Sequence, residues 1–180
     1  HPLAGIASWV EQLQGFNRQH PNRALALLIH IGEDCEDMSL RSAIRRCHEA
    51  IVLGAHRLGH ALALSPTLAA SMAGRCRGES VKMRRRQIYY DLTHAKALQV
   101  LGIEVDEQQL QAELVELENS DPGARVILMA SEFELNVRQE LVRALLREKD
   151  IVVETCPTSN RRMLGLQANE PQPFEGLLQS

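Results

Sequence analysis

The sequence predicts an α/β protein in which parallel strands form a sheet and helices pack outside it. Two largely apolar runs, 24–29 and 151–155, have the length and composition of strands in such a sheet. Segments with helical spacing alternate with the predicted strands, as the connections of a parallel sheet require. The strands end in polar residues, and functional groups gather at that edge of a parallel sheet.

An amphipathic helix is predicted over residues 4–17, where apolar side chains recur at helical spacing. Its stripe comprises Ile6, Trp9, Val10, Leu13 and Phe16. The polar residues 17–23 predict a loop. The run 24–29 then leads to His30, and we expect a strand that is buried on both faces, although periodicity alone also admits a buried helix.

The next helix is predicted to begin after Ser39, a favourable N-cap, and to end at Gly54, where a left-handed glycine is favoured. Its core stripe contains Leu40, Ala43, Ile44, Cys47, Ala50 and Ile51. Residues 55–60 predict a short strand that ends at His60. The stretch 62–70 contains a proline and predicts a loop that leads into a short helix.

The middle of the chain, residues 71–123, predicts a helical hairpin. A basic cluster opens it and contains Arg75, Arg77, Lys82, Arg84, Arg85 and Arg86. A long helix over 88–101 is predicted to end at Gly102, and a second helix near 106–118 has an acidic exposed face. A strong turn signal, Asp121-Pro122-Gly123, closes the segment.

The last third predicts one more helix and one more strand. Ser131 and Glu134 form an S-x-x-E capping box after a brief apolar run at 126–129. The helix behind the box places Phe133, Val137, Leu141 and Leu145 on its apolar stripe. Residues 151–155 predict a strand, and Cys156–Asn160 predict a loop that local hydrogen bonds fix.

Composition and charge narrow the classes of function. The chain has 180 residues, a net charge of −3 and a pI near 6.2, which argues against nucleic acid as a partner. No apolar run approaches the ~18 residues that cross a bilayer, and no signal peptide is recognisable. Four scattered cysteines without a CxxC pair suit a reducing compartment, so we expect a cytoplasmic protein. The unusual start at His1 leads us to expect a piece of a longer protein.

Two histidines at the ends of predicted strands carry the functional prediction. Glu33 follows His30 by three residues, and an imidazole can bind Zn²⁺ while a nearby carboxyl carries a proton. His60 follows Gly59, which lets the backbone pass close to another element. Each histidine alone is more often structural, but two on one sheet edge favour a functional site. Three further histidines are predicted to lie at the surface: His48, His56 and His94.

Three motifs occur in order: His30-Ile31-Gly32-Glu33, Arg57-Leu58-Gly59-His60 and Glu154-Thr155-Cys156-Pro157-Thr158-Ser159-Asn160. Their order and strand context resemble the adenosine deaminase family of metal-dependent amidohydrolases, which usually shows HAGE, RIGHG and E-x-CPTSN. The resemblance covers roughly residues 20–64 and 130–175. It implies part of a (β/α)₈ TIM barrel, about strands five to seven, with a helical insertion after strand six.

The resemblance divides the chain into a barrel portion (1–64), the helical insertion (65–124) and a second barrel portion (125–180). It implies that the parent protein hydrolyses adenosine or an adenine nucleotide to the inosine product and ammonia, with zinc as cofactor. His30 would be a zinc ligand, Glu33 would protonate the purine ring, and His60 would deprotonate or orient the zinc-bound water. Two residues, Ser159 and Asn160, would shape the loop after the seventh strand.

The sequence also departs from the family pattern. Ile31 replaces an alanine, Ala61 replaces a glycine, and the segment between His60 and Ile151 is longer than the family's. The sequence lacks the HxH zinc ligands of the first strand, the glycine motif of the fourth and the aspartate pair of the eighth. We expect the parent protein to supply these segments.

A second class of function stays open. The chain could be a deaminase-like scaffold that serves assembly without activity of its own, by analogy with large bacterial proteins of anti-phage defence. The insertion 65–124 has a basic start and an acidic second helix, which could pair between subunits, so we expect a homo-oligomer. The sequence does not distinguish adenosine, deoxyadenosine, a nucleotide or an adenine base in RNA as the substrate.

Overall fold

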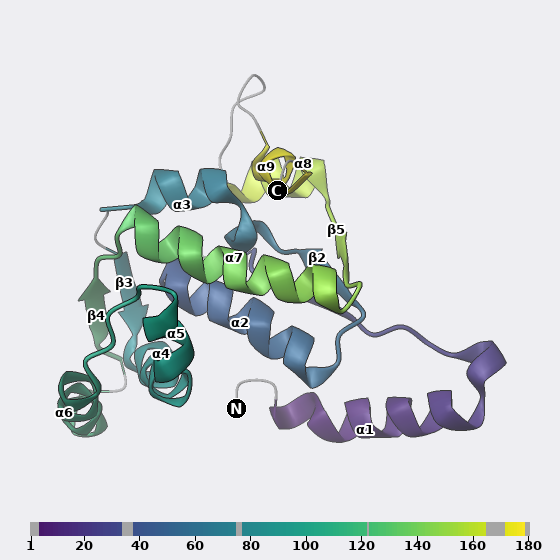
Figure 1. Cartoon of the computed structure of the whole chain (residues 1–180), viewed down its shortest axis with the longest axis horizontal. Coiled ribbons are helices and arrows are strands. Elements are labelled where there is room, and N and C mark those ends of the chain that lie inside the picture. The colour runs from purple at the N-terminus through teal and green to yellow at the C-terminus, as the bar shows by residue number, and fades with distance from the viewer. Residues whose placement is uncertain (1–3, 34–37, 75–76, 122, 165–171, 179–180) are drawn as a thin grey trace.

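The computed structural model confirms the α/β class and shows a small parallel sheet (Figure 1). It describes residues 4–33, 38–74, 77–121, 123–164 and 172–178. The sheet has the strand order β1-β2-β5, with β1 (Leu28–Ile31), β2 (Arg57–His60) and β5 (Val152–Glu154). All three predicted strands therefore exist, and each pairs in parallel with its neighbour.

Helices α2 (Leu40–Leu53) and α7 (Glu132–Glu148) lie side by side and cover one face of this sheet (Figure 1). Ile29, Leu58 and Val153 point into the core that these helices share with the sheet. The remaining elements around the sheet are α1 (Ala4–Gln19), η1 (Pro21–Arg23), η2 (Leu62–Leu64), α3 (Pro66–Met72), α8 (Pro157–Leu164) and α9 (Pro173–Leu178). None of the described helices is long and apolar enough to cross a membrane.

The opposite face of the sheet is largely exposed within the described residues. Leu28, Arg57 and Val152 stand in one row across the three strands, and the two apolar members are 37% and 49% exposed. The expectation that 24–29 is a strand buried on both faces was therefore wrong. The strand begins only at Leu28, and its outer side chains stay accessible because α2 and α7 cover a single face.

The two predicted ends of α2 are confirmed. Ser39 Oγ accepts a hydrogen bond from the backbone N–H of Ser42 at 3.2 Å, which satisfies one free donor of the first turn. Gly54 adopts a φ of 109°, a conformation that glycine tolerates best, and its N–H bonds to the carbonyl of Ile51. These caps fix the length of the helix that joins β1 to β2.

The predicted insertion is not purely helical. It contains α4 (Val81–Thr93), α5 (Ala95–Val100) and α6 (Glu107–Glu118), and β3 (Arg77–Ser80) precedes them. β3 pairs in antiparallel fashion with β4 (Arg125–Leu128), which we had assigned to the second barrel portion. The helix expected over 88–101 begins earlier and breaks at His94. The sequence of β3, Arg-Gly-Glu-Ser, has no alternation of apolar and polar residues, so the sequence did not predict that strand.

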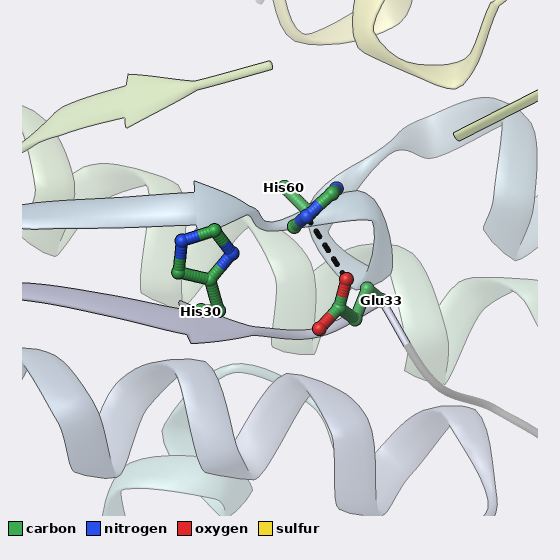
Figure 2. A group of neighbouring side chains, drawn as sticks. All are labelled: His30, Glu33 and His60. Atoms are coloured by element: carbon green, nitrogen blue, oxygen red, sulfur yellow. Dashed lines mark ion pairs between the residues drawn. The ribbon is translucent and has the colours of Figure 1, made fainter. Parts of the chain in front are cut away.

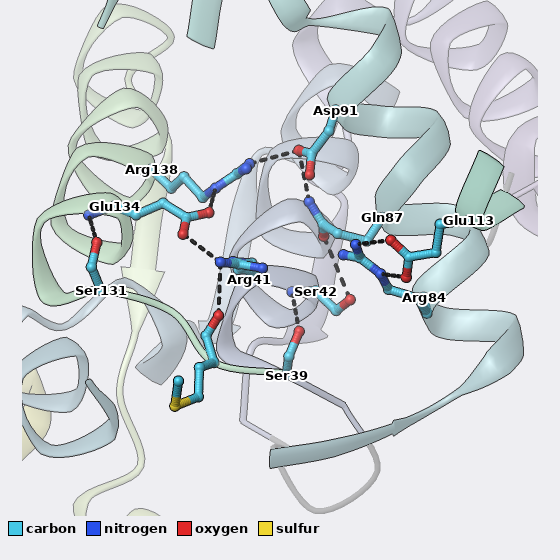
Figure 3. A network of polar contacts seen from close by, with 11 residues as sticks. Ser39, Arg41, Ser42, Arg84, Gln87, Asp91, Glu113, Ser131, Glu134 and Arg138 are labelled. Atoms are coloured by element: carbon cyan, nitrogen blue, oxygen red, sulfur yellow. Dashed lines mark hydrogen bonds and ion pairs between the residues drawn. The ribbon is translucent and has the colours of Figure 1, made fainter. Parts of the chain in front are cut away.

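A polar network fastens the insertion to the α2–α7 layer (Figure 3). Arg138 on α7 contacts Asp91 on α4 at 2.7 Å, and both side chains are almost fully buried. Glu134 accepts from Arg138 at 2.9 Å and from Arg41 on α2 at 2.5 Å. Arg84 and Glu113 form a second, two-pronged pair between α4 and α6. Buried charges need such partners, so the network fixes how the layers meet.

The predicted apolar stripe of α7 is confirmed only in part, because Val137 and Leu145 pack against the hydrophobic cores whereas Phe133 does not. Phe133 is 59% exposed, whereas the buried positions are Leu135, Arg138, Gln139, Val142, Arg143 and Leu146. Three of these are polar, and each finds a buried acceptor. The capping box is half formed, because Ser131 Oγ accepts from the Glu134 N–H while the Glu134 carboxylate binds arginines instead.

Candidate metal centre

The structure brings His30, Glu33 and His60 together at the carboxyl end of the parallel sheet (Figure 2). One donor atom from each lies within 4.8 Å of the other two. His60 Nε2 is 3.0 Å from Glu33 Oε2, and the rings of His30 and His60 are 5.3 Å apart between centroids. Three residues that the sequence predicted to share a site therefore lie close together.

Parallel register places the two histidines beside each other. His30 pairs across the ladder with Gly59, one residue before His60. A Cβ atom on Gly59 would lie 2.9 Å from Cγ and Nδ1 of His30, so only glycine leaves room for this imidazole. The prediction that Gly59 permits a close approach is thus confirmed, and the element that approaches is the His30 ring.

The backbone leaves both strands through left-handed conformations. Gly32 has a φ of 73°, and His60 and Ala61 have φ values of 68° and 47°. The N–H of Ala61 donates to the carbonyl of Ile31 at 3.0 Å, and the N–H of Ala63 donates to Gly32 at 2.8 Å. These bonds hold His60 and Ala61, two non-glycine residues, in the left-handed conformation. Backbone strain of this kind often occurs at functional sites.

Asn160 lies on α8, the helix that follows β5, and it orients the His60 side chain. Its Oδ1 lies 2.6 Å from His60 Nδ1, and the Asn160 side chain is completely buried. An amide oxygen only accepts, so this contact places a proton on Nδ1 and directs the Nε2 lone pair toward Glu33.

The expected loop at Cys156–Asn160 is instead the start of a helix. α8 begins at Pro157, and the N–H of Asn160 donates to the Cys156 carbonyl at 2.8 Å. Ser159 is exposed, whereas Asn160 is buried against His60. A proline at the first helical position was the available signal for this helix. The contact to His60 spans 100 residues, and no local pattern carries it.

The remaining histidines are not simply surface residues. His56 is exposed, but its Nδ1 accepts a hydrogen bond from the N–H of Leu27 at 3.0 Å. His48 and His94 belong to an aromatic cluster with Tyr90, in which Tyr90 and His94 stack at 4.2 Å. Burial, followed by the nearby His94, lowers the pKa of His48 below its ordinary value, and Glu49 partly opposes this shift.

Chemically, the site offers two imidazoles and one carboxylate, a donor set found in catalytic zinc sites. His30 is exposed, Glu33 is 28% exposed, and His60 is 6% exposed, so the set opens toward solvent on one side. An accessible imidazole thus lies beside a buried imidazole that Asn160 orients, and together with Glu33 they could hold a metal ion. No protein-family model matches the chain, and a search of curated proteins also found no match.

Proposed function

We propose that the chain contributes to a zinc-dependent deaminase that hydrolyses adenosine or an adenine nucleotide to the inosine product and ammonia. The observation that carries the proposal is the convergence of His30, Glu33 and His60 within 4.8 Å at adjacent strand ends. The motif resemblance suggests the reaction, and the short distances among these three side chains support the proposal. Hydrolysis consumes one water, and the purine amino group leaves as ammonia.

His30 would hold the metal, because its imidazole is accessible and its ring is set by the gap at Gly59. When bound, zinc lowers the pKa of a coordinated water toward ~7. The Glu33 carboxyl, whose Oε2 lies 3.0 Å from His60 Nε2, would supply a proton to a ring nitrogen of the purine. His60 Nε2 can accept a proton from water, and Asn160 keeps Nδ1 protonated while it does so.

The exposed face of the sheet supports a larger parent barrel. β1 and β5 are the edges of the described sheet, and Leu28 and Val152 remain accessible on its uncovered face. Parallel sheets are ordinarily covered on both faces, and unpaired edges invite further strands. We propose that strands from the parent protein pair with both edges, close a (β/α)₈ barrel and bring the remaining zinc ligands to His30.

Ammonia release from adenosine by the parent protein tests this function. Glu33→Gln should lower the rate by about 10²–10⁴-fold, because it removes a proton donor without changing the size of the side chain. The matched control is Glu132→Gln, an exposed residue of α7 that should keep full activity. Full activity of both Glu33→Gln and His60→Gln would contradict the proposed function.

A scaffold role remains a second candidate, and exposed apolar residues of the insertion favour it. Val100 is 87% exposed and Val115 is 59% exposed, so both side chains are accessible to a partner. We propose that this surface contacts another subunit. Val100→Asp and Val115→Asp should then lower the particle mass measured by light scattering, and an unchanged mass would argue against the interface.

A further inference from the structure

A second concave site lies between α2 and α4, and none of the residues proposed for deamination lines it. Its volume is about 470 Å³, which falls within the range of small-molecule sites. His48 and Val52 line it from α2, whereas Arg86, Tyr89, Tyr90 and His94 line it from α4 and its C-terminal cap.

The interior of this groove is aromatic and ordered. Tyr90 and His94 stack at 4.2 Å with an interplanar angle of 28°. His48 stands edge-on to both rings at 5.5 Å. The Tyr90 carbonyl holds the His94 ring through Nδ1 at 2.8 Å, so the rings form a fixed surface against which a flat molecule can stack.

The lining of the groove includes two charged side chains, Glu49 and Arg86. Among the described residues, Arg86 has no hydrogen-bond or ion-pair partner, whereas Glu49 accepts from Arg45 at 2.7 Å through Oε1 and its Oε2 is buried away from the surface. The lowered pKa of His48 keeps that imidazole neutral near pH 7. The guanidinium of Arg86 is therefore the charge available to a ligand, and it favours an anionic group.

The groove continues past Arg86 and Tyr89. Both residues also line a neighbouring hollow of about 390 Å³, which exposes Lys82 one helical turn before Arg86. Lys82 likewise lacks a partner within the described part of the chain. Two cations one turn apart, next to a half-exposed tyrosine, combine stacking with phosphate binding.

We propose that this groove binds a nucleoside phosphate, with its base against the Tyr90–His94 stack and its phosphate at Arg86 and Lys82. A base and a phosphate are present both in a free nucleotide and in one nucleotide of a single-stranded nucleic acid. The net charge of the chain is −3. Two neighbouring cations can still bind one phosphate, because a single phosphate does not require an extended basic surface.

The test follows the imidazole C–H resonances of His48 and His94 by NMR during titration with AMP, adenosine and inorganic phosphate. Stacking of the base should shift both resonances. AMP should bind roughly tenfold more tightly than adenosine, since a hydrogen bond to a charged group contributes about that factor. Arg86→Gln should remove this advantage and leave adenosine binding unchanged, and Tyr89→Ala should weaken both ligands. Arg18→Gln, an exposed arginine of α1, should match the wild type.

Equal affinities for AMP and adenosine, or equal AMP binding by wild type and Arg86→Gln, would overturn the proposal. So would shifts confined to His30 and His60, because AMP would then occupy only the deaminase site. A pentanucleotide that binds more tightly than AMP identifies a single strand as the source, and equal binding identifies the free nucleotide. The readout at His48 and His94 is independent of ammonia release, so each proposal can fail alone.

Discussion

Asn160 Oδ1 lies 2.6 Å from His60 Nδ1 and joins α8 to the end of β2. Asn160→Ala should leave the buried Nδ1–H without an acceptor, which costs about 1–3 kcal/mol. It should also allow His60 to change tautomer. Urea unfolding measures the first effect, and the ¹⁵N shifts of the imidazole measure the second.

Ser159→Ala is the matched control for Asn160→Ala, because Ser159 precedes Asn160 on the same turn and is exposed. It should change stability by less than about 0.5 kcal/mol and leave the tautomer unaltered. An unaltered tautomer in Asn160→Ala would mean that another group orients His60.

The gap at Gly59 makes a second prediction. Gly59→Ala would place a methyl carbon 2.9 Å from the His30 ring, so His30 should swing away from Glu33 and His60. We expect a loss of about 1–3 kcal/mol in unfolding free energy and weaker binding of Zn²⁺. Gly15→Ala in α1 is the control, since its nearest neighbour would be 3.9 Å away and alanine should stabilise that helix by roughly 0.5–1 kcal/mol. Unchanged zinc affinity in Gly59→Ala would contradict this account of the site.

The buried pair between Asp91 and Arg138 should dominate the attachment of the insertion. Both side chains are less than a tenth exposed, and Asp91→Ala leaves the buried Arg138 with Glu134 as its remaining carboxylate partner, so it should cost about 1–3 kcal/mol. Glu118→Ala removes the exposed partner of Arg85 and should cost less than about 1 kcal/mol. Similar losses in the two variants, measured by urea unfolding, would show that the network does not hold the layers together.

Stability should fall in mild acid because of His48. Burial, then His94, lowers its pKa from 6.5 in the folded state, so the unfolded chain takes up the proton at a higher pH. The contribution of neutral His48 is full above about pH 6.5 and is lost as the pH falls toward the lowered value. His48→Gln should reduce the loss of stability between about pH 7.5 and 5, whereas exposed His20→Gln should keep it. An identical pH dependence in His48→Gln would contradict the assignment.

Residue patterns within a few positions of one another predicted the helix caps and the strand ends. The caps at Ser39 and Gly54, the strand ending at His60 and the position of the two site histidines on neighbouring strands follow from residue type and spacing. The break at His94 and the strand at Arg77–Ser80 could not be predicted, because tertiary packing decides them. Arg138 and Gln139 are buried polar residues of α7 that a hydrophobic stripe necessarily overlooks.

The same distinction separates the parts of the site. His30, Glu33 and His60 carry recognisable motifs, whereas the role of Asn160 rests on a contact between residues 100 positions apart. A helix start after Pro157 was within reach of the sequence, but the burial of Asn160 against His60 depends on how α8 returns to the sheet.

Zinc-edge anomalous diffraction from crystals of the parent protein grown with Zn²⁺ tests the central claim most directly. The account predicts a peak about 2.0–2.1 Å from a ring nitrogen of His30, close to Glu33 and His60, and no such peak in His30→Gln crystals. A peak that avoids His30, or one that persists at the same position in His30→Gln, would contradict a metal centre at the ends of β1 and β2.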